Sequence, residues 1–242
     1  MAWVTKSSDE QYAPEPAPRE YTKQEKAANW WHYHKILVLV VVILLGLLAW
    51  IIHDMFFRVQ PDFQIGYVGP RNLSEATAEA LEQALIPYVS DRNGDGQVIV
   101  QLDQYLVDFA PDSADPYSQL AGTTQLTAAL AEGSEVYLFL LEDPAGFESQ
   151  TQALQYTDGT LPGEDDLDNW QQMVYRWQDC PLLAGLDLGE VATGENSVSG
   201  QSLLDGLYIG CRGNWYDEVP EAYTVNSGLW ATLTAGAVPV EG

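Results

Sequence analysis

The sequence predicts an α/β protein in which one N-terminal transmembrane helix precedes a layered domain with an at least partly parallel sheet. The first observation is an uninterrupted apolar run over residues 36–52 of the 242-residue chain. The second is that strand-like and helix-like segments alternate from residue 64 onward, which is typical of βαβ architecture. The third is the charge distribution, since 29 of the 35 Asp and Glu residues follow residue 57.

The apolar run has no charged side chain, and only the Trp50 indole can form a hydrogen bond. At about 1.5 Å per residue it covers roughly 25 Å, and extension through Phe57 approaches the hydrocarbon thickness of about 30 Å. A core helix of a soluble protein would show a polar face. We therefore predict a transmembrane helix over residues 36–57, with His53 and Asp54 near the outer headgroups. No polar residue interrupts the run 36–52 to serve transport, so its role is to tether the protein.

The orientation of this helix follows from the basic residues around it. Four precede the run and two follow it: Arg19, Lys23, Lys26 and Lys35 before, Arg58 and Arg71 after. The positive-inside rule then places the N-terminus in the cytoplasm and residues 58–242 outside. A cleaved signal peptide is the alternative, but the region before the run is long and no small-x-small cleavage motif follows it. An uncleaved signal anchor is favoured.

Two segments precede the predicted span. Residues 1–20, with the proline-rich stretch 13–18, are expected to form a disordered cytoplasmic tail. Residues 21–35 are expected to be a juxtamembrane interfacial segment, helical at first and then rich in Trp, Tyr and His before Lys35. Such aromatic residues with a lysine seat a helix at the membrane surface.

The juxtamembrane segment Glu25–Lys35, with its paired Trp30 and Trp31, carries a resemblance. It resembles that of uncharacterised single-span, membrane-anchored extracytoplasmic proteins of Gram-positive bacteria, whose outer domains often contain an Asp-x-Asn-Gly-Asp-Gly loop. This chain has such a loop at Asp91–Gly96. The matching residues cover a small part of the chain. The resemblance implies a membrane-anchored architecture and no particular activity.

The outer domain is expected to open with a strand over residues 64–68. Asn72 and Glu75 then suggest an N-cap and capping box for a helix that Pro87 ends or kinks. Residues 97–106 are expected to form a strand, because Val98, Val100 and Leu102 recur at every second position. Later elements are a helix over 116–130, a buried strand over 135–141, a helix after Asp143-Pro144, an exposed loop over 150–169, a short helix over 170–177, a strand over 202–210 and a helix over 226–234.

The composition of the outer domain excludes most enzyme classes. After residue 57 the sequence has no histidine and no lysine, so Ser-His-Asp, Cys-His, Ser-Lys and P-loop sites lack an essential residue. Carboxylate-pair hydrolysis remains, but no pair stands out among 29 acids. The acidic field argues against nucleic acid and anionic lipid as partners. We predict a protein that is not an enzyme.

The acidic loop matches part of a calcium-binding loop. Asp91, Asn93, Asp95 and Gln97 occupy positions one, three, five and seven, and Gly96 supplies the turn. Position twelve is Leu102, so the bidentate carboxylate is missing. The sequence thus predicts a calcium site with these four ligands, and the alternative is a connection whose Asp, Asn and Gly residues only favour turns.

Two arginines suggest an anion or ligand site. Arg71 follows the first predicted strand, and Arg212 follows the strand that ends at Gly210. If these strands are parallel, both guanidinium groups face one cleft at the carboxyl ends of the sheet. Alternatively, each pairs with a nearby carboxylate. Aromatic residues would line such a cleft or fill the core: Tyr67, Trp170, Trp177, Trp215 and Trp230.

The two cysteines, Cys180 and Cys211, would lie outside the cell, where a disulfide is stable, although two buried free thiols are equally compatible with their spacing. Taken together, these features predict a membrane-anchored module that binds a small solute or a partner protein without catalysis. Its layout resembles one lobe of extracytoplasmic solute-binding proteins at the level of fold. A structural or assembly protein of the cell envelope is the alternative, followed by a carboxylate-based hydrolase.

Overall fold

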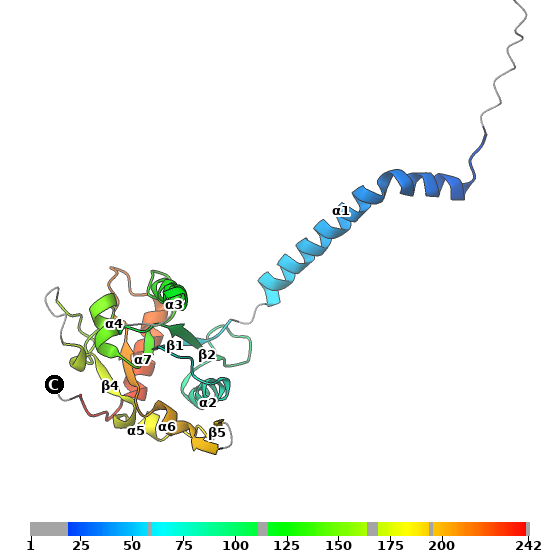
Figure 1. Ribbon diagram of the computed structural model, residues 1–242. Coiled ribbons are helices and arrows are strands. Elements are labelled where there is room, and N and C mark those ends of the chain that lie inside the picture. Colours follow the sequence, from blue (N-terminus) through cyan, green and yellow to red (C-terminus); the bar gives the residue numbers. More distant parts are fainter. Residues whose placement is uncertain (1–18, 58–59, 111–115, 164–168, 194–195, 241–242) are drawn as a thin grey trace, which may run out of the picture. The chain divides into compact units, whose positions relative to one another are not determined.

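The computed structural model describes residues 19–57, 60–110, 116–163, 169–193 and 196–240 (Figure 1). The chain divides into two compact units, Met1–Val59 and Gln60–Gly242. The boundary falls within two residues of the predicted start of the outer domain at residue 58.

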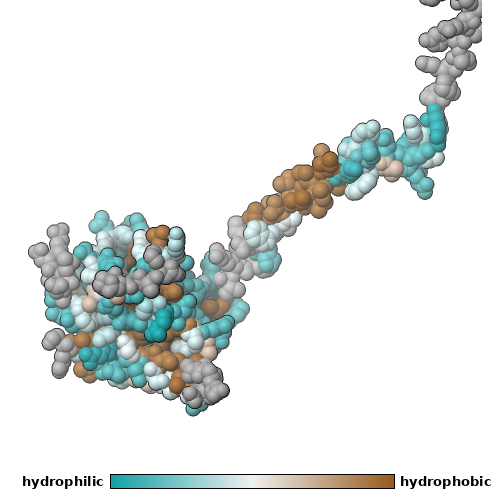
Figure 2. Space-filling model, viewed as in Figure 1, coloured by the Kyte–Doolittle hydropathy of each residue, from teal (hydrophilic) through white to brown (hydrophobic). Residues whose placement is uncertain are grey.

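The first unit contains one long helix, α1 (Lys23–Phe57). It begins with a capping box, because the Thr22 backbone N–H donates to the Glu25 carboxylate (2.9 Å) and Glu25 N–H donates to Thr22 Oγ1 (3.3 Å). In the part of the chain that the structure describes, Lys23–His53 is the one stretch long and apolar enough to cross a membrane. Its apolar side chains are exposed and form the continuous hydrophobic band in Figure 2.

The second unit is built on a mixed five-stranded sheet with the order β2-β1-β3-β7-β4. Strands β1 (Phe63–Gly69), β2 (Val100–Leu106) and β3 (Leu138–Leu141) are parallel, with Ile65 opposite both Leu102 and Leu138. Strand β7 (Tyr208–Cys211) runs antiparallel to β3, and β4 (Val174–Arg176) runs antiparallel to β7. The predicted α/β layering and partly parallel sheet are confirmed.

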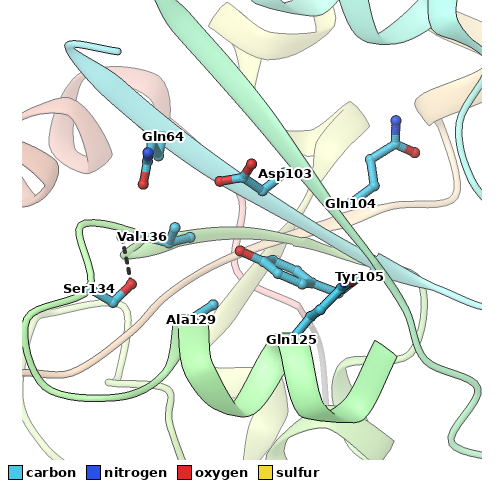
Figure 3. Close-up of a pocket in the computed structure, with 8 residues that line it drawn as sticks. All are labelled: Gln64, Asp103, Gln104, Tyr105, Gln125, Ala129, Ser134 and Val136. Carbon is cyan, nitrogen blue, oxygen red and sulfur yellow. Dashed lines mark hydrogen bonds between the residues drawn. The ribbon is translucent and has the colours of Figure 1, made fainter. Parts of the chain in front are cut away.

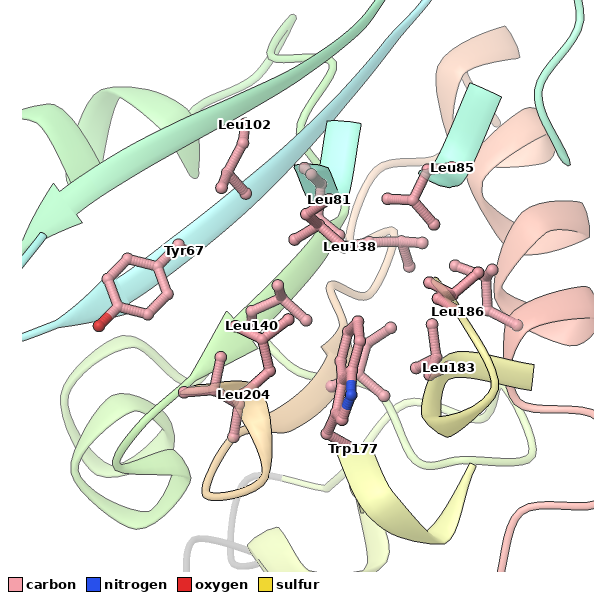
Figure 4. Packing of buried hydrophobic residues seen from close by; sticks show 14 of the residues in the cluster. Tyr67, Leu81, Leu85, Leu102, Leu138, Leu140, Trp177, Leu183, Leu186 and Leu204 are labelled. Carbon is pink, nitrogen blue, oxygen red and sulfur yellow. The ribbon is translucent and has the colours of Figure 1, made fainter. Parts of the chain in front are cut away.

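Helices cover both faces of this sheet. One face carries α2 (Glu75–Leu85), α5 (Pro181–Ala184), α6 (Gly200–Leu204) and α7 (Glu221–Leu233), which contribute to the larger hydrophobic cluster (Figure 4). The other face carries α3 (Pro116–Ala129) and α4 (Pro144–Thr151). Shorter elements are the 3-10 helices η1 (Ile86–Tyr88), η2 (Trp170–Gln172) and η3 (Trp177–Asp179), and the hairpin of β5 (Glu190–Thr193) and β6 (Asn196–Ser199).

Strand β3 explains the continuous apolar run in the sequence. Leu138 and Leu140 belong to the cluster under α2 and α7, whereas Phe139 and Leu141 belong to the cluster under α3 and α4. All four side chains are fully buried. A central strand covered on both faces needs apolar residues at every position, as the sequence predicted.

Several predicted elements differ in detail. The N-cap of α2 is Ser74, whose hydroxyl accepts from the Thr77 N–H (3.2 Å), rather than Asn72. The segment 170–177 contains strand β4 instead of one helix, because it pairs with β7. The predicted strand 202–210 is helix α6 followed by β7. These segments are short, and tertiary pairing decides their conformation.

The segment predicted as an exposed loop, residues 150–169, is partly buried where it is described. Ala153, Leu154 and Gln155 are buried, and Leu154 bridges to Arg212 beside β7. The Gln155 N–H donates to the Cys211 carbonyl (2.9 Å). This extension was missed because its polar composition resembles a surface connection.

Both cysteines are free and buried in the core. Burial raises the pKa of the Cys180 and Cys211 thiols to about 12. Thiols of this kind are inert at neutral pH, because the thiolate is the reactive form. Of the predicted cleft aromatics, Tyr67, Trp177 and Trp230 are core residues.

Glu148 on α4 is a buried carboxyl group, only 2% exposed, whose Oε2 accepts from the Leu154 N–H (3.0 Å). Burial raises its pKa from 4.5 to about 7, against the lowering effect of the backbone donors. Between these values the unfolded chain binds fewer protons, so rising pH favours unfolding. We expect the second unit to lose about 3 kcal/mol of stability between pH 4.5 and pH values above 7.

Glu148→Gln is expected to remove most of this dependence, as measured by urea unfolding at pH 5 and pH 8. Glu79→Gln, on the exposed side of α2, controls for loss of a carboxylate elsewhere. Equal pH slopes in wild type and Glu148→Gln would show that Glu148 is ionised throughout.

Candidate functional site

The carboxyl ends of β1, β2 and β3 meet at one edge of the sheet, and β1 lies between the other two. Open α/β sheets bind ligands at such a position. A small cavity of about 140 Å³ lies there. It is lined by Val68, Gly69, Pro70, Val107, Asp108, Phe109, Glu142 and Asp143.

The polar groups of this cavity already have protein partners. The Tyr67 hydroxyl donates to Glu142 Oε1 and lies 2.9 Å from the Arg71 carbonyl oxygen. Asp143 caps α4 by accepting from the Gly146 N–H (2.9 Å), and Asp108 accepts from the Ala110 N–H (3.0 Å). Each of these carboxylates uses one oxygen in its contact, and together the contacts stabilise the strand ends.

Arg71 and Arg212 do not share a cleft. Arg71 is exposed beside the carboxyl end of β1, as predicted. Arg212 follows β7, which is antiparallel to β3, so it lies at the amino ends of the parallel strands. This corrects the expectation of one anion site, which required the two strands to be parallel.

Arg212 has a structural role instead. Arg212 is 3% exposed. Its guanidinium group donates to the carbonyl oxygens of Ala129 (3.3 Å) and Ala131 (3.2 Å) at the end of α3. The guanidinium carbon lies 4.9 Å from the centre of the Tyr137 ring. A cation at a helix C-terminus is stabilised by the helix dipole, and the aromatic face adds a cation–π contact.

The loop Asp91–Gln97 is held by its own side chains. Asp91 accepts from the N–H groups of Gly94 (2.7 Å) and Gly96 (2.9 Å). Asn93 Oδ1 accepts from Asp95 N–H, and Asp95 Oδ1 accepts from Gln97 N–H, both at 2.8 Å. The alternative of a turn-forming connection accounts for these bonds.

Asp62, which the sequence reasoning missed, fastens this loop to the sheet. Its carboxylate accepts from the N–H groups of Arg92 (2.7 Å), Asn93 (3.2 Å) and Ile99 (2.9 Å), although the residue is 1% exposed. Burial alone raises the pKa of Asp62, but these donors and the Arg92 charge outweigh it and hold the pKa below its usual value. An ionised Asp62 is therefore part of the folded loop.

A larger hollow of about 470 Å³ lies between β1, β2 and α3, on the side of the sheet covered by α3 (Figure 3). We call it the α3 hollow. Its lining residues are Gln64, Asp103, Gln104, Tyr105, Gln125, Ala129, Ser134 and Val136. Its volume lies within the range of about 300–1,000 Å³ found for small-molecule sites.

Tyr105 is the distinctive group of this hollow. The residue is 7% exposed, and its ring packs against Phe139 with a centroid separation of 6.4 Å. Its hydroxyl points into the hollow, and among the described residues it has no hydrogen-bond partner (Figure 3). The hydroxyl faces the open space of the hollow, so it is accessible to solvent and to a ligand. Burial, followed by the Asp103 charge, raises the pKa of Tyr105, which keeps the phenol protonated.

No protein-family model, curated protein or solved structure matches the chain. The resemblance of the juxtamembrane segment therefore stays a prediction. Function must be argued from the geometry alone.

The α3 hollow combines hydrogen-bonding groups from several elements of the fold. Gln64 comes from β1, Asp103 and Tyr105 from β2, and Gln125 from α3. In the sequence, Gln101, Asp103 and Tyr105 recur at every second position of β2 and so share one face of the strand. Helix α3 covers part of this face. Such an arrangement can hold a small polar molecule in a defined orientation.

Proposed function

We propose that this chain is a membrane-anchored, extracytoplasmic α/β module that binds a small solute without catalysis, and that the solute binds in the α3 hollow. The observation that carries this proposal is the Tyr105 hydroxyl, which faces the hollow from an otherwise buried ring and has no hydrogen-bond partner among the described residues. A ligand that pairs with this group gains a hydrogen bond that the protein alone does not make.

Three features support the anchored arrangement. Helix α1 is long and apolar enough to span a membrane. The basic residues cluster before its apolar run, which favours a cytoplasmic N-terminus. The outer unit has 29 acidic residues and a core of its own, so it is suited to stay in solvent beside the membrane.

The absence of catalysis is argued from the lining of the hollow. Among the described residues that line the hollow, Asp103 is the single carboxylate. Glycoside hydrolysis needs two carboxyl groups that face each other at roughly 5–10 Å. A group of residues with one carboxylate, amides and hydroxyls is suited to hold a molecule and has no acid–base pair to cleave it.

A thermal-shift assay of the full-length protein in detergent tests the proposal. Sugars, amino acids, polyamines and organic acids are added as separate classes, to wild type and to Tyr105→Phe. A ligand at about a hundredfold excess over its Kd is expected to stabilise wild type by about 2.7 kcal/mol, which raises Tm by roughly 5–10 °C.

The Tyr105→Phe variant is expected to show a smaller shift with the same class, because it lacks only the hydroxyl. Tyr175→Phe on β4 is the matched control and should respond like wild type. No shift with any class, or equal shifts in wild type and Tyr105→Phe, would remove the proposal.

Calcium binding by the loop remains a separate proposal. No group of three or more His, Cys, Asp or Glu side chains that could hold a metal occurs in the described residues, and the loop offers two carboxylates and an amide. The side chain at position twelve, Leu102, is buried in β2. With this ligand missing, we expect a Kd near the weak extracellular range of about 1 mM.

At about 5 mM calcium, such a site stabilises the fold by about 1 kcal/mol, which raises Tm by roughly 2–4 °C relative to chelator. The measurement is a melting curve in calcium, in magnesium and in chelator. Identical melting curves in all three conditions would contradict calcium binding, and the loop would then be a turn-forming connection only.

A further inference from the structure

We infer that the ligand of the α3 hollow is a neutral, hydroxyl-rich molecule of the saccharide class. This inference rests on the proposed function and names the chemistry that the site recognises. It is argued from the charge of the lining, from the pairing capacity of its side chains, and from the rigidity of the elements that carry them.

The charge of the hollow disfavours anionic ligands. In the described part of the chain, the lining of the hollow includes one charged residue, Asp103, and no arginine. The sequence after residue 57 contains no lysine and has a net charge of −24, from 29 acids and five arginines. A carboxylate or phosphate would approach through a negative field and find no cation to pair with.

The hydrogen-bonding groups match hydroxyls. The amides of Gln64 and Gln125 and the hydroxyl of Tyr105 can each donate and accept, as a sugar hydroxyl does. The Asp103 carboxylate accepts from Gln101 Nε2 (2.6 Å) at one oxygen and can accept a ligand hydroxyl at the other. Gln104 is not included, because it points away in Figure 3 and its Oε1 accepts from the Leu73 N–H.

The Tyr105 hydroxyl favours ligands that carry hydroxyl groups over cationic ligands. A protonated phenol needs an acceptor for its proton, and an ammonium group has donors but no lone pair. A ligand hydroxyl can accept that proton and donate its own to Asp103. A cation would pair with Asp103 but could not accept the phenol proton, so it would use one hydrogen-bonding group of the hollow fewer than a hydroxyl ligand.

The framework that positions these groups is rigid. Gln64 and Asp103 project from paired strands β1 and β2. The Tyr105 ring is fixed between Phe139 and the backbone at Gly66, where an added Cβ would lie 3.0 Å from Tyr105 and 2.6 Å from Phe139. Groups that are held in place before binding lose little entropy when a ligand binds.

Isothermal titration calorimetry of the full-length protein in nanodiscs tests the inference. The probes are glucose and cellobiose as neutral saccharides, glucuronate as an anion, and spermidine and lysine as cations. We expect a neutral saccharide to bind with a Kd between about 1 μM and 1 mM, and glucuronate to bind at least about tenfold more weakly than glucose.

Tyr105→Phe is expected to weaken saccharide binding about tenfold, the upper range for one neutral hydrogen bond. Tyr175→Phe is the matched control and should bind like wild type. Asp103→Asn retains a hydrogen-bonding group and should keep measurable saccharide affinity, whereas it should abolish any binding of spermidine. Melting curves of each variant establish that it is folded.

The possible outcomes distinguish failure of the saccharide inference from failure of the proposed function. Binding of spermidine or lysine that depends on Tyr105, without saccharide binding, overturns the ligand class and leaves the proposed function standing. Saccharide binding that is equal in wild type and Tyr105→Phe overturns the hollow as the site. If no probe class binds in a way that depends on Tyr105, both the inference and the proposed function fail.

Discussion

Gly122→Ala is expected to lower the free energy of unfolding of the outer domain by about 3 kcal/mol or more, at the high end for overpacking. Gly122 lies in α3, where the helix crosses the end of β2. A Cβ atom at this position would lie 1.8 Å from the Leu106 carbonyl oxygen and 2.6 Å from its carbonyl carbon. Both atoms belong to the backbone, so the contact is relieved only if the helix moves away from the sheet.

The matched control is Gly228→Ala in α7. An added Cβ at Gly228 meets no atom within 4 Å, so alanine should be neutral or should stabilise the helix by about 0.5–1 kcal/mol through its higher propensity. Urea unfolding monitored by tryptophan fluorescence measures both variants. Similar stabilities for the two variants would contradict the close packing of α3 on β2, and with it the wall of the α3 hollow.

A cysteine at position 76 is expected to react with a membrane-impermeant maleimide on intact cells, whereas a cysteine at position 17 should react only after permeabilisation. Ala76 lies on the exposed surface of α2, and Ala17 lies in the N-terminal tail. The result should be close to all or none, because the lipid core blocks the charged reagent. This prediction follows from the basic residues before the span.

The native cysteines provide the background control. Cys180 and Cys211 are buried and their pKa values are raised to about 12, so wild type should remain unlabelled until it is denatured. The reverse pattern, with position 17 labelled on intact cells, would invert the topology. Labelling of position 76 only after permeabilisation would place the α/β unit inside the cell.

Long periodic or continuous patterns in the sequence predicted the fold well. The apolar run gave α1, and the run 135–141 gave β3, because complete burial on both faces requires apolar residues throughout. The Asp143-Pro144 signal also predicted the start of α4, where Asp143 accepts from Gly146. In each case local chemistry and tertiary environment favour the same structure.

Strands β4 and β7 could not be predicted in the same way. They have three and four residues, and they form because they pair with each other and with β3. The direction of β7 is a property of the whole sheet, and no residue near Gly210 encodes it. For this reason the sequence placed Arg212 at the same edge as Arg71, which the antiparallel pairing corrects.

The candidate site was even less visible in the sequence. Nothing in the spacing of Asp103 and Tyr105 marks them as a site, because the hollow forms only when α3 packs over this part of β2. Asp62 was one acid among 29, and its role appears only when three distant N–H groups converge on it. Burial and missing partners are properties of the folded chain, so they cannot be derived from composition or spacing.

Native mass spectrometry of the full-length protein, released gently from membranes, tests the central claim most directly. If the chain is a solute-binding module that uses the α3 hollow, wild type should carry one small additional mass that Tyr105→Phe carries at much lower occupancy. Tyr175→Phe should retain it. Equal occupancy of the additional mass in wild type and Tyr105→Phe, or its absence from both, would contradict the account.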